Sequence, residues 1–191
     1  DGDGVADLYE NLNSEFGVGG NYHEINSLDS DGKGGYYLAL GNASYNSPTY
    51  YHVRGDYSKM GRRGRNYSAV SWKGWLMHVD QDGKLTPWAS GFRMQNGVML
   101  DNDGNLWSGD NQGDWKATTP FYHLKKGNFY GHPSGLVWSS GWDPSKDPLE
   151  LSLNELKAMK TPAAILLPHD IMNSSASQPI QIPEDSFGPY G

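Results

Sequence analysis

Short runs in which apolar and polar residues alternate recur along this chain, and most are bounded by glycine, asparagine or aspartate. This alternation is typical of half-buried β-strands. It predicts strands near 22–28, 35–41, 74–80, 84–89, 97–101, 105–109 and 120–125. A further strand is expected within "PAAILLP", residues 162–168.

One segment has the periodicity of a helix instead. In "LSLNELKAMK", residues 151–160, apolar residues recur at helical intervals. Ser152 and Glu155 have the spacing of a capping box, which predicts the start of the helix. Thr161-Pro162 predicts its end, because the residue before proline disfavours the helical conformation.

The turn motif Asp-x-Asp-Gly stands between apolar runs in three places, within 28–42, 79–91 and 100–111. Glycine after aspartate accepts a positive φ, so each motif predicts a hairpin. The aspartates before the glycines, Asp31, Asp82 and Asp103, are 51 and 21 residues apart. Alternating long and short intervals are typical of propeller blades with four antiparallel strands. The sequence therefore predicts an all-β partial β-propeller of about three blades with one short helix.

Closed propellers have about 4–8 blades, so we expect a single-domain propeller fragment over residues 1–191. We expect the remaining blades or domains of a longer chain as partners, because open sheet edges expose unpaired backbone groups. The predicted parts are a calcium-binding loop and partial strand at 1–20, core blades at 21–140, a helical insertion at 141–161 and the start of a further blade at 162–191.

The composition narrows the class of protein. The chain has 25 Gly, 11 Pro and 24 aromatic residues, which favours a β protein rich in turns. Its net charge of −7 argues against nucleic acid as the main partner. The absence of cysteine excludes disulfides, cysteine-ligated zinc and thiol catalysis. No apolar run approaches the roughly 20 residues of a membrane span.

The first residues, "DGDGVAD", place Asp1, Asp3 and Asp7 around Gly4. Such oxygen-rich loops resemble the calcium loops of EF-hand-like and dockerin-like repeats. The alternative is an acidic surface turn.

Two motifs carry a resemblance to a known family. "GFRMQNGVMLDNDGNLWSGDNQGD", starting at Gly91, and "GNFYGHP", residues 127–133, resemble the glucose/sorbosone dehydrogenase-like propellers, relatives of the soluble PQQ-dependent sugar dehydrogenases. The resemblance covers roughly residues 1–140 and is closest to propellers of large multidomain bacterial proteins. The matching pieces are Gly91-Phe92-Arg93, Gly97, Asp103-Gly104, Leu106-Trp107, Gln112-Gly113 and Gly127 to Pro133.

The resemblance implies roles for particular residues. His23 matches the general base, which takes the hydroxyl proton of a sugar, a role that suits an imidazole. Arg93 matches the arginine beside the quinone, where a fixed cation stabilises developing negative charge. Gly113 and Asp114 fall where backbone carbonyls hold Ca²⁺. The cofactor site would comprise Arg93, Gln112 and Gly113, and the substrate site Tyr22, Trp115 and His132.

The sequence departs from the family pattern at two positions, and local structural roles stay open. Met94 stands where the family has an asparagine, and Asp114 replaces a proline. Arg93 could equally form a salt bridge at the end of a strand. His23, beside Glu24, could equally be a structural histidine. The loop 110–114 also fits an Asx-turn.

Three functions follow from these patterns. The first is a quinoprotein-like oxidoreductase that acts on a sugar or polyol with PQQ and Ca²⁺, in a secreted or periplasmic protein. The second is a calcium-dependent gluconolactonase-like hydrolase with Asn96 and Asp110 as candidate metal ligands. The third is a non-catalytic propeller that binds carbohydrate or protein.

Overall fold

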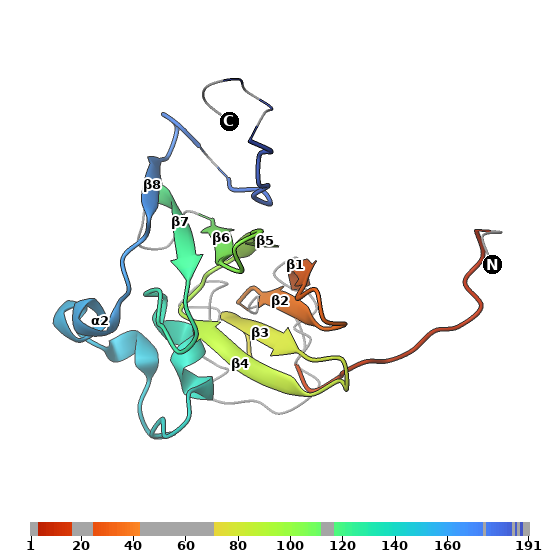
Figure 1. Cartoon of the computed structure of the whole chain (residues 1–191). Helices are drawn as coiled ribbons and strands as arrows, with labels where there is room; N and C mark the ends of the chain where they lie inside the picture. The colour runs from red at the N-terminus through yellow and green to blue at the C-terminus, as the bar shows by residue number, and fades with distance from the viewer. Residues whose placement is uncertain are drawn as a thin grey trace.

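A computed structural model describes residues 4–16, 25–42, 71–111, 117–173, 175–184, 186 and 188, which contain two four-stranded antiparallel sheets (Figure 1). The first sheet consists of β1 (Ile25–Ser30), β2 (Tyr36–Leu40), β3 (Trp75–Val79) and β4 (Leu85–Ser90). The second consists of β5 (Gln95–Leu100), β6 (Leu106–Asp110), β7 (Thr118–Leu124) and β8 (Ile165–Pro168). In both, strands that follow one another in the chain are neighbours, which is the strand order of a propeller blade. The predicted all-β partial propeller is confirmed.

The position of β8 differs from the prediction. Residues 162–191 were expected to start a further blade, but β8 pairs with β7, with Thr118 opposite Pro168 and Phe121 opposite Ile165. β8 therefore completes the second sheet, and the described residues form two blades where about three were predicted. The helical insertion between β7 and β8 separates the paired strands in sequence, so local patterns did not indicate their pairing.

That insertion contains η2 (Pro133–Trp138), η3 (Pro148–Glu150) and α2 (Leu153–Met159). The predicted capping box is present: the Ser152 hydroxyl accepts from Glu155 N at 3.3 Å, and the Glu155 carboxylate accepts from Ser152 N at 2.8 Å. Leu156 is the buried residue of α2 and packs with Phe129 and Leu136. No helix of the described ranges is long and apolar enough to cross a membrane.

The three predicted hairpins are present, but a different aspartate organises two of them. The carboxylate of Asp101 accepts from the backbone N–H groups of Asp103 and Asn105, at 3.0 and 2.7 Å. Asp80 does the same in its turn. In the first hairpin this role belongs to Asp31, which accepts from Lys33 and Gly35. The structurally equivalent residues are therefore Asp31, Asp80 and Asp101, because the organising carboxylate must precede its N–H donors by two and four residues.

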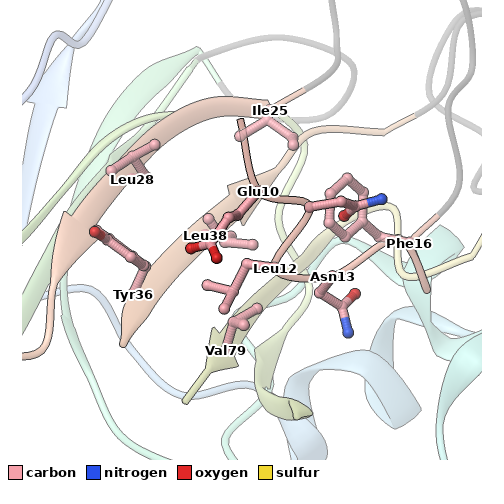
Figure 2. A pocket seen from close by; sticks show the side chains of 10 residues that line it. Glu10, Leu12, Asn13, Phe16, Ile25, Leu28, Tyr36, Leu38 and Val79 are labelled. Atoms are coloured by element: carbon pink, nitrogen blue, oxygen red, sulfur yellow. The ribbon is translucent and has the colours of Figure 1, made fainter. Parts of the chain in front are cut away.

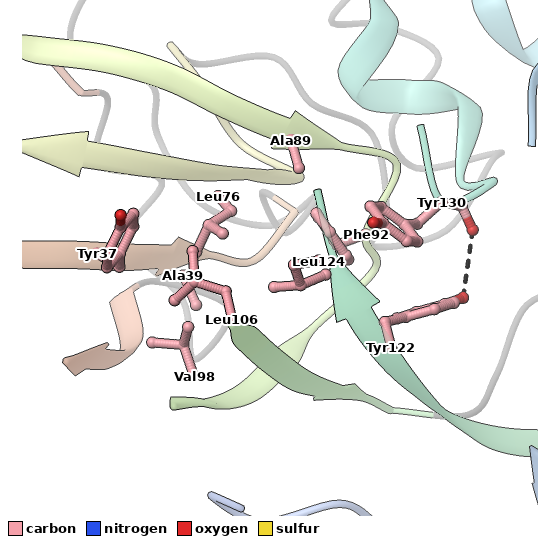
Figure 3. Packing of buried hydrophobic residues seen from close by; sticks show 10 residues of the cluster. All are labelled: Tyr37, Ala39, Leu76, Ala89, Phe92, Val98, Leu106, Tyr122, Leu124 and Tyr130. Atoms are coloured by element: carbon pink, nitrogen blue, oxygen red, sulfur yellow. Dashed lines mark hydrogen bonds between the residues drawn. The ribbon is translucent and has the colours of Figure 1, made fainter. Parts of the chain in front are cut away.

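The main apolar core lies between the two sheets (Figure 3). Tyr37 and Ala39 of β2 face it from the first sheet, and Leu106 and Tyr122 face it from the second. The Tyr122 hydroxyl donates to the Tyr130 carbonyl at 3.2 Å, so its polar atom is satisfied inside the core. Burial raises the pKa of Tyr122, and the nearby charge of Asp110 adds to this effect.

The first strands of the two sheets lie side by side. Val98 N donates to the Ser27 hydroxyl at 2.8 Å, and Leu100 N donates to the Asp29 carboxylate at 2.7 Å. Both pairs are 71 residues apart in sequence, so β1 and β5 run in the same direction. Adjacent first strands are what blades around a common axis require. The side chains of Ser27 and Asp29 thus accept from backbone N–H groups of β5, which would be unpaired if β5 were an open edge of its sheet.

The other face of the first sheet is apolar and partly covered by the N-terminal segment, residues 4–16. Tyr36 and Leu38 alternate with core residues of β2, so they lie on the face that points away from the second sheet. Figure 2 shows Leu12 and Phe16 opposite this face, around a pocket of about 260 Å³. Asn13 Nδ2 donates to Gly83 O at 2.8 Å and ties the segment to the β3–β4 turn.

Candidate functional site

Arg93 stands on a short loop between β4 and β5 whose backbone is held from two sides. Arg93 N donates to the Asp110 carboxylate at 3.2 Å, and Arg93 O accepts from Asn42 N at 2.9 Å. Met94 N donates to the second oxygen of Asp110 at 2.7 Å. Asp110 ends β6 and Asn42 follows β2, so both sheets fix the loop that carries this half-buried arginine.

The residue that organises this loop is a fully buried carboxylate. Asp110 has no exposed surface. A buried charge is costly unless it is hydrogen-bonded, and bonds from backbone N–H groups to a carboxylate are among the stronger ones in proteins. Asp110 therefore has a structural role that the sequence did not indicate, because its donors precede it by 16 and 17 residues.

Buried polar groups without partners gather at the same end of the second sheet. Gln95 begins β5 opposite Asp110, Asn111 follows β6, and Thr119 lies near the start of β7. Both polar atoms of the Gln95 amide, Asn111 Oδ1 and Thr119 Oγ1 have no hydrogen-bond partner in the part of the chain described. An unpaired buried polar group costs roughly 1–3 kcal/mol, so these atoms are candidates for contact with a bound polar molecule, with water or with another part of the chain.

We call this region the Arg93 end; it consists of Arg93, Gln95, Asp110, Asn111 and Thr119. In this region the half-buried Arg93 belongs to the same strand ends as buried amide and hydroxyl atoms without partners in the described ranges, and the N–H groups of Arg93 and Gln95 are suitable donors to the oxygens of a polar cofactor. As far as the described residues go, these side chains fit the polar groups of a quinone.

His132 lies beside this end, inside the fold. Its side chain is nearly buried, with 4% of the residue exposed. Its Nδ1 is 2.9 Å from the Ser134 hydroxyl and 3.2 Å from Asn42 Nδ2, and its backbone N donates to Gly91 O. Asn42 therefore contacts both His132 and the Arg93 loop. The structure gives His132 a structural role as the N-cap of η2, and its contact with a substrate stays a prediction.

Most of the other predicted site residues lie outside the described residues. These are Asp1, Asp3, Tyr22, His23, Gln112, Gly113, Asp114 and Trp115. Asp7 is described, and it is exposed in a segment without helix or strand. Within the described ranges, no group of three or more His, Asp or Glu side chains is arranged to hold a metal. The calcium prediction therefore remains a prediction.

The two candidate ligands of the hydrolase alternative are engaged separately. Asn96 Nδ2 donates to Ala176 O at 2.7 Å, and the carboxylate of Asp110 accepts from the Arg93 loop. Both residues thus have structural contacts, and their role as metal ligands stays a prediction.

Sequence reasoning missed three residues of this region. Asn42 was not among the predicted site residues, yet it is fully buried. Gln95 and Thr119 are polar residues at strand positions that the fold buries, and no sequence pattern around them signals this burial. Because their neighbours come from distant strands, the sequence pattern could not indicate what they face.

Comparisons with known proteins give matches among solved structures. No protein-family model matches the sequence, and no curated protein matches it. The apo-form of a soluble aldose sugar dehydrogenase from Escherichia coli matches with 19% identity and a TM-score of 0.45, over 74% of this chain and 39% of that one. A glucose dehydrogenase matches with 17% identity and a TM-score of 0.37, over 56% of this chain and 29% of that one.

A third match is the PQQ-bound form of an aldose sugar dehydrogenase from Streptomyces coelicolor, with 19% identity and a TM-score of 0.35, over 56% of this chain and 30% of that one. The chain thus spans less than half the length of each of these three proteins. All three are sugar dehydrogenases, the group whose sequence motifs this chain resembles.

Proposed function

We propose that this chain is part of a quinoprotein propeller that oxidises a sugar or polyol, with His23 and Arg93 at its reaction centre. The observation that carries the proposal is the parallel contact between β1 and β5. His23 is the second residue before β1, and Arg93 is the second residue before β5. Both residues therefore come directly before the first strands of neighbouring blades in the chain, and the two hydrogen bonds hold these strands side by side.

The chemistry assigns a different task to each residue. The imidazole of His23 takes the proton of the substrate hydroxyl, since its ordinary pKa lies near neutrality. The guanidinium of Arg93 stabilises the negative charge that develops when the substrate is oxidised, and its backbone is already fixed before substrate binds. When bound, PQQ supplies the acceptor for the hydride of the sugar.

Other groups of the chain hold the cofactor in this proposal. Arg93 and the Gln95 amide bind its polar atoms, and Asn111 Oδ1 accepts from one of its donors. The backbone carbonyls of Gly113 and Asp114 hold Ca²⁺. The buried carboxylate of Asp110 acts indirectly, because it positions the loop that carries Arg93.

The test is dye reduction by the complete protein after addition of PQQ and Ca²⁺, measured with a panel of aldoses and polyols. We expect reduction with at least one of them, a loss of at least about a hundredfold in kcat for His23→Ala, and a comparable loss for Arg93→Ala. Asp103→Asn, in an exposed turn, is the control and should retain full activity.

Two results would contradict the proposal. One is full dehydrogenase activity in His23→Ala, which would remove this residue from the reaction. The other is the absence of dye reduction with every polyol, together with metal-dependent hydrolysis of a lactone, which would favour the hydrolase.

A further inference from the structure

A second candidate binding site lies on the first sheet and the insertion that follows β7. It is a groove of about 650 Å³, which is within the range of small-molecule sites. Five of the seven tryptophans of the chain line it. We call it the Trp groove, and define it by Trp72, Trp75, Trp88, Trp138 and Trp142.

The fold holds these rings in place. Trp75 Nε1 donates to Gly135 O at 2.8 Å, which joins β3 to η2. Trp72 contacts the rings of Trp75 and Trp138 at centroid distances of 5.6 and 6.1 Å. Trp142 Nε1 donates to Lys146 O at 3.3 Å. Rings fixed before binding lose little conformational entropy when a ligand arrives.

Two observations distinguish the groove from an ordinary aromatic core. Four of its five tryptophans are only half-buried, whereas the core aromatics Phe92 and Tyr122 have no exposed surface. Trp72 also has a φ of 66°, a left-handed conformation that is unusual and strained for a bulky residue. Backbone strain of this kind tends to occur at binding sites.

The lining indicates the chemistry of the ligand. None of the described residues that line the groove is charged, and the hydroxyl-bearing residues Ser90, Ser139 and Ser140 lie among the indoles. Lys126 approaches from outside the lining, with Nζ 5.0 Å from the centre of the Trp88 ring. A neutral ligand with apolar faces and hydroxyl edges complements this surface, because an indole packs on the apolar face while serine hydroxyls reach the edge.

We propose that the Trp groove binds a neutral polysaccharide by stacking its sugar rings on the indoles. Several indoles in one groove offer faces for more than one consecutive ring. The groove shares no residue with the Arg93 end, so binding here requires neither PQQ, Ca²⁺ nor His23. It would attach the protein to a glycan independently of any reaction.

Affinity electrophoresis of the 191-residue chain tests this proposal, in native gels with or without a soluble β-glucan, galactomannan or xylan. We expect at least one of them to retard the chain, and Trp142→Ala to weaken this binding about tenfold, which corresponds to about 1.4 kcal/mol. Trp107→Ala is the matched control. Trp107 is also half-buried and stacks on Phe121 and His123, but it lies in β6, outside the groove. Its loss should leave binding unchanged.

Two conservative variants keep the proposal testable if Trp142→Ala does not fold. If circular dichroism shows that Trp142→Ala is unfolded, Trp142→Phe keeps an aromatic ring against Phe129 and Leu136 and should weaken binding about threefold, while Trp107→Phe should not. The proposal is overturned if none of the polysaccharides retards the chain, or if the Trp142 variants bind as tightly as the Trp107 variants. Binding of a proline-rich peptide, the other usual ligand of an aromatic groove, without binding of polysaccharide would also overturn it.

Discussion

At the scale of single residues, the buried carboxylate of Asp110 has the most consequence, because one side chain sets the position of the Arg93 loop. Its two oxygens accept from consecutive backbone N–H groups, those of Arg93 and Met94. A side chain with one acceptor oxygen cannot replace both bonds with equal strength.

We therefore expect Asp110→Asn to reduce the free energy of unfolding by roughly 1–3 kcal/mol, because a buried backbone donor loses its charged acceptor. Urea unfolding followed by tryptophan fluorescence measures this change. The control is Asp103→Asn, an exposed residue of the β5–β6 turn, which should differ from the native chain by less than about 0.5 kcal/mol. Equal stability of the two variants would refute this role for Asp110.

A second residue-scale feature is the carboxyl of Asp101. Hydrogen bonds lower its pKa from 3.8 to about 2, and the largest contribution comes from the indole N–H of Trp107, at 2.8 Å. The N–H groups of Asn105 add to the effect. Because the pKa in the folded chain is lower than in the unfolded chain, the ionised carboxylate stabilises the fold above about pH 4. This stabilisation is lost as the pH falls through about 2.

The prediction is a fall in the urea midpoint of the native chain between pH 4 and pH 2, and a smaller fall in Asp101→Asn. Asp103→Asn should keep the native dependence. If Asp101→Asn shows the same slope as the native chain in this window, then the lowered pKa of Asp101 does not contribute to acid sensitivity.

At the scale of elements, the C-terminal segment 175–184 lies directly against β5. Asn96 donates to Ala176 O, and Gly97 has a φ of 112° with the backbone of Gln178 next to its Cα. A Cβ built on Gly97 would lie 2.1 Å from Gln178 Cα, a distance that no real side chain tolerates. Glycine at this position therefore permits both the backbone conformation and the close approach.

Gly97→Ala should consequently displace the segment 175–184. It should lower the free energy of unfolding by more than the same substitution in a turn glycine without close neighbours. Gly104→Ala is the matched control, since Gly104 also has a positive φ, 82°, but nothing within 4 Å of the added Cβ. We expect Gly104→Ala to lower the free energy of unfolding by about 1–3 kcal/mol because of backbone strain. Gly97→Ala should lower it by about 1–3 kcal/mol more because of the clash with Gln178. Urea unfolding compares the two, and faster proteolysis after Gln178 should accompany only Gly97→Ala. Equal destabilisation would show that the contact with Gln178 is unimportant.

The elements also show what local sequence patterns could predict. Strands, hairpins and the capped helix α2 were predictable, because alternation, Asp-Gly turns and the Ser152–Glu155 box act between near neighbours. The pairing of β8 with β7 was not predictable, because a strand pattern does not specify its partner across an insertion. The sequence also did not show which aspartate of each Asp-x-Asp-Gly motif accepts from the N–H groups of the turn. Asp80 and Asp82 are equivalent in sequence, and only the backbone geometry selects Asp80 as the acceptor.

At the scale of the whole molecule, the described residues form two adjacent blades with an apolar core between them. The Arg93 end depends on this arrangement, because Asn42 of the first blade and Asp110 of the second both hold the loop. Sequence motifs indicated Arg93 but not its supports, since these come from strand ends that meet only after the sheets pack. The apolar outer face around Tyr36 and Leu38 is the kind of surface that a further blade would cover.

The contact between β1 and β5 has a consequence for the way this protein unfolds. The side chains of Ser27 and Asp29 complete the backbone hydrogen bonds of Val98 and Leu100. If either blade unfolded alone, these amides would lose their acceptors. The apolar core that the two blades share would also be exposed to water. We therefore expect the two blades to unfold together as one cooperative unit, and we expect a single blade excised from the chain not to fold independently.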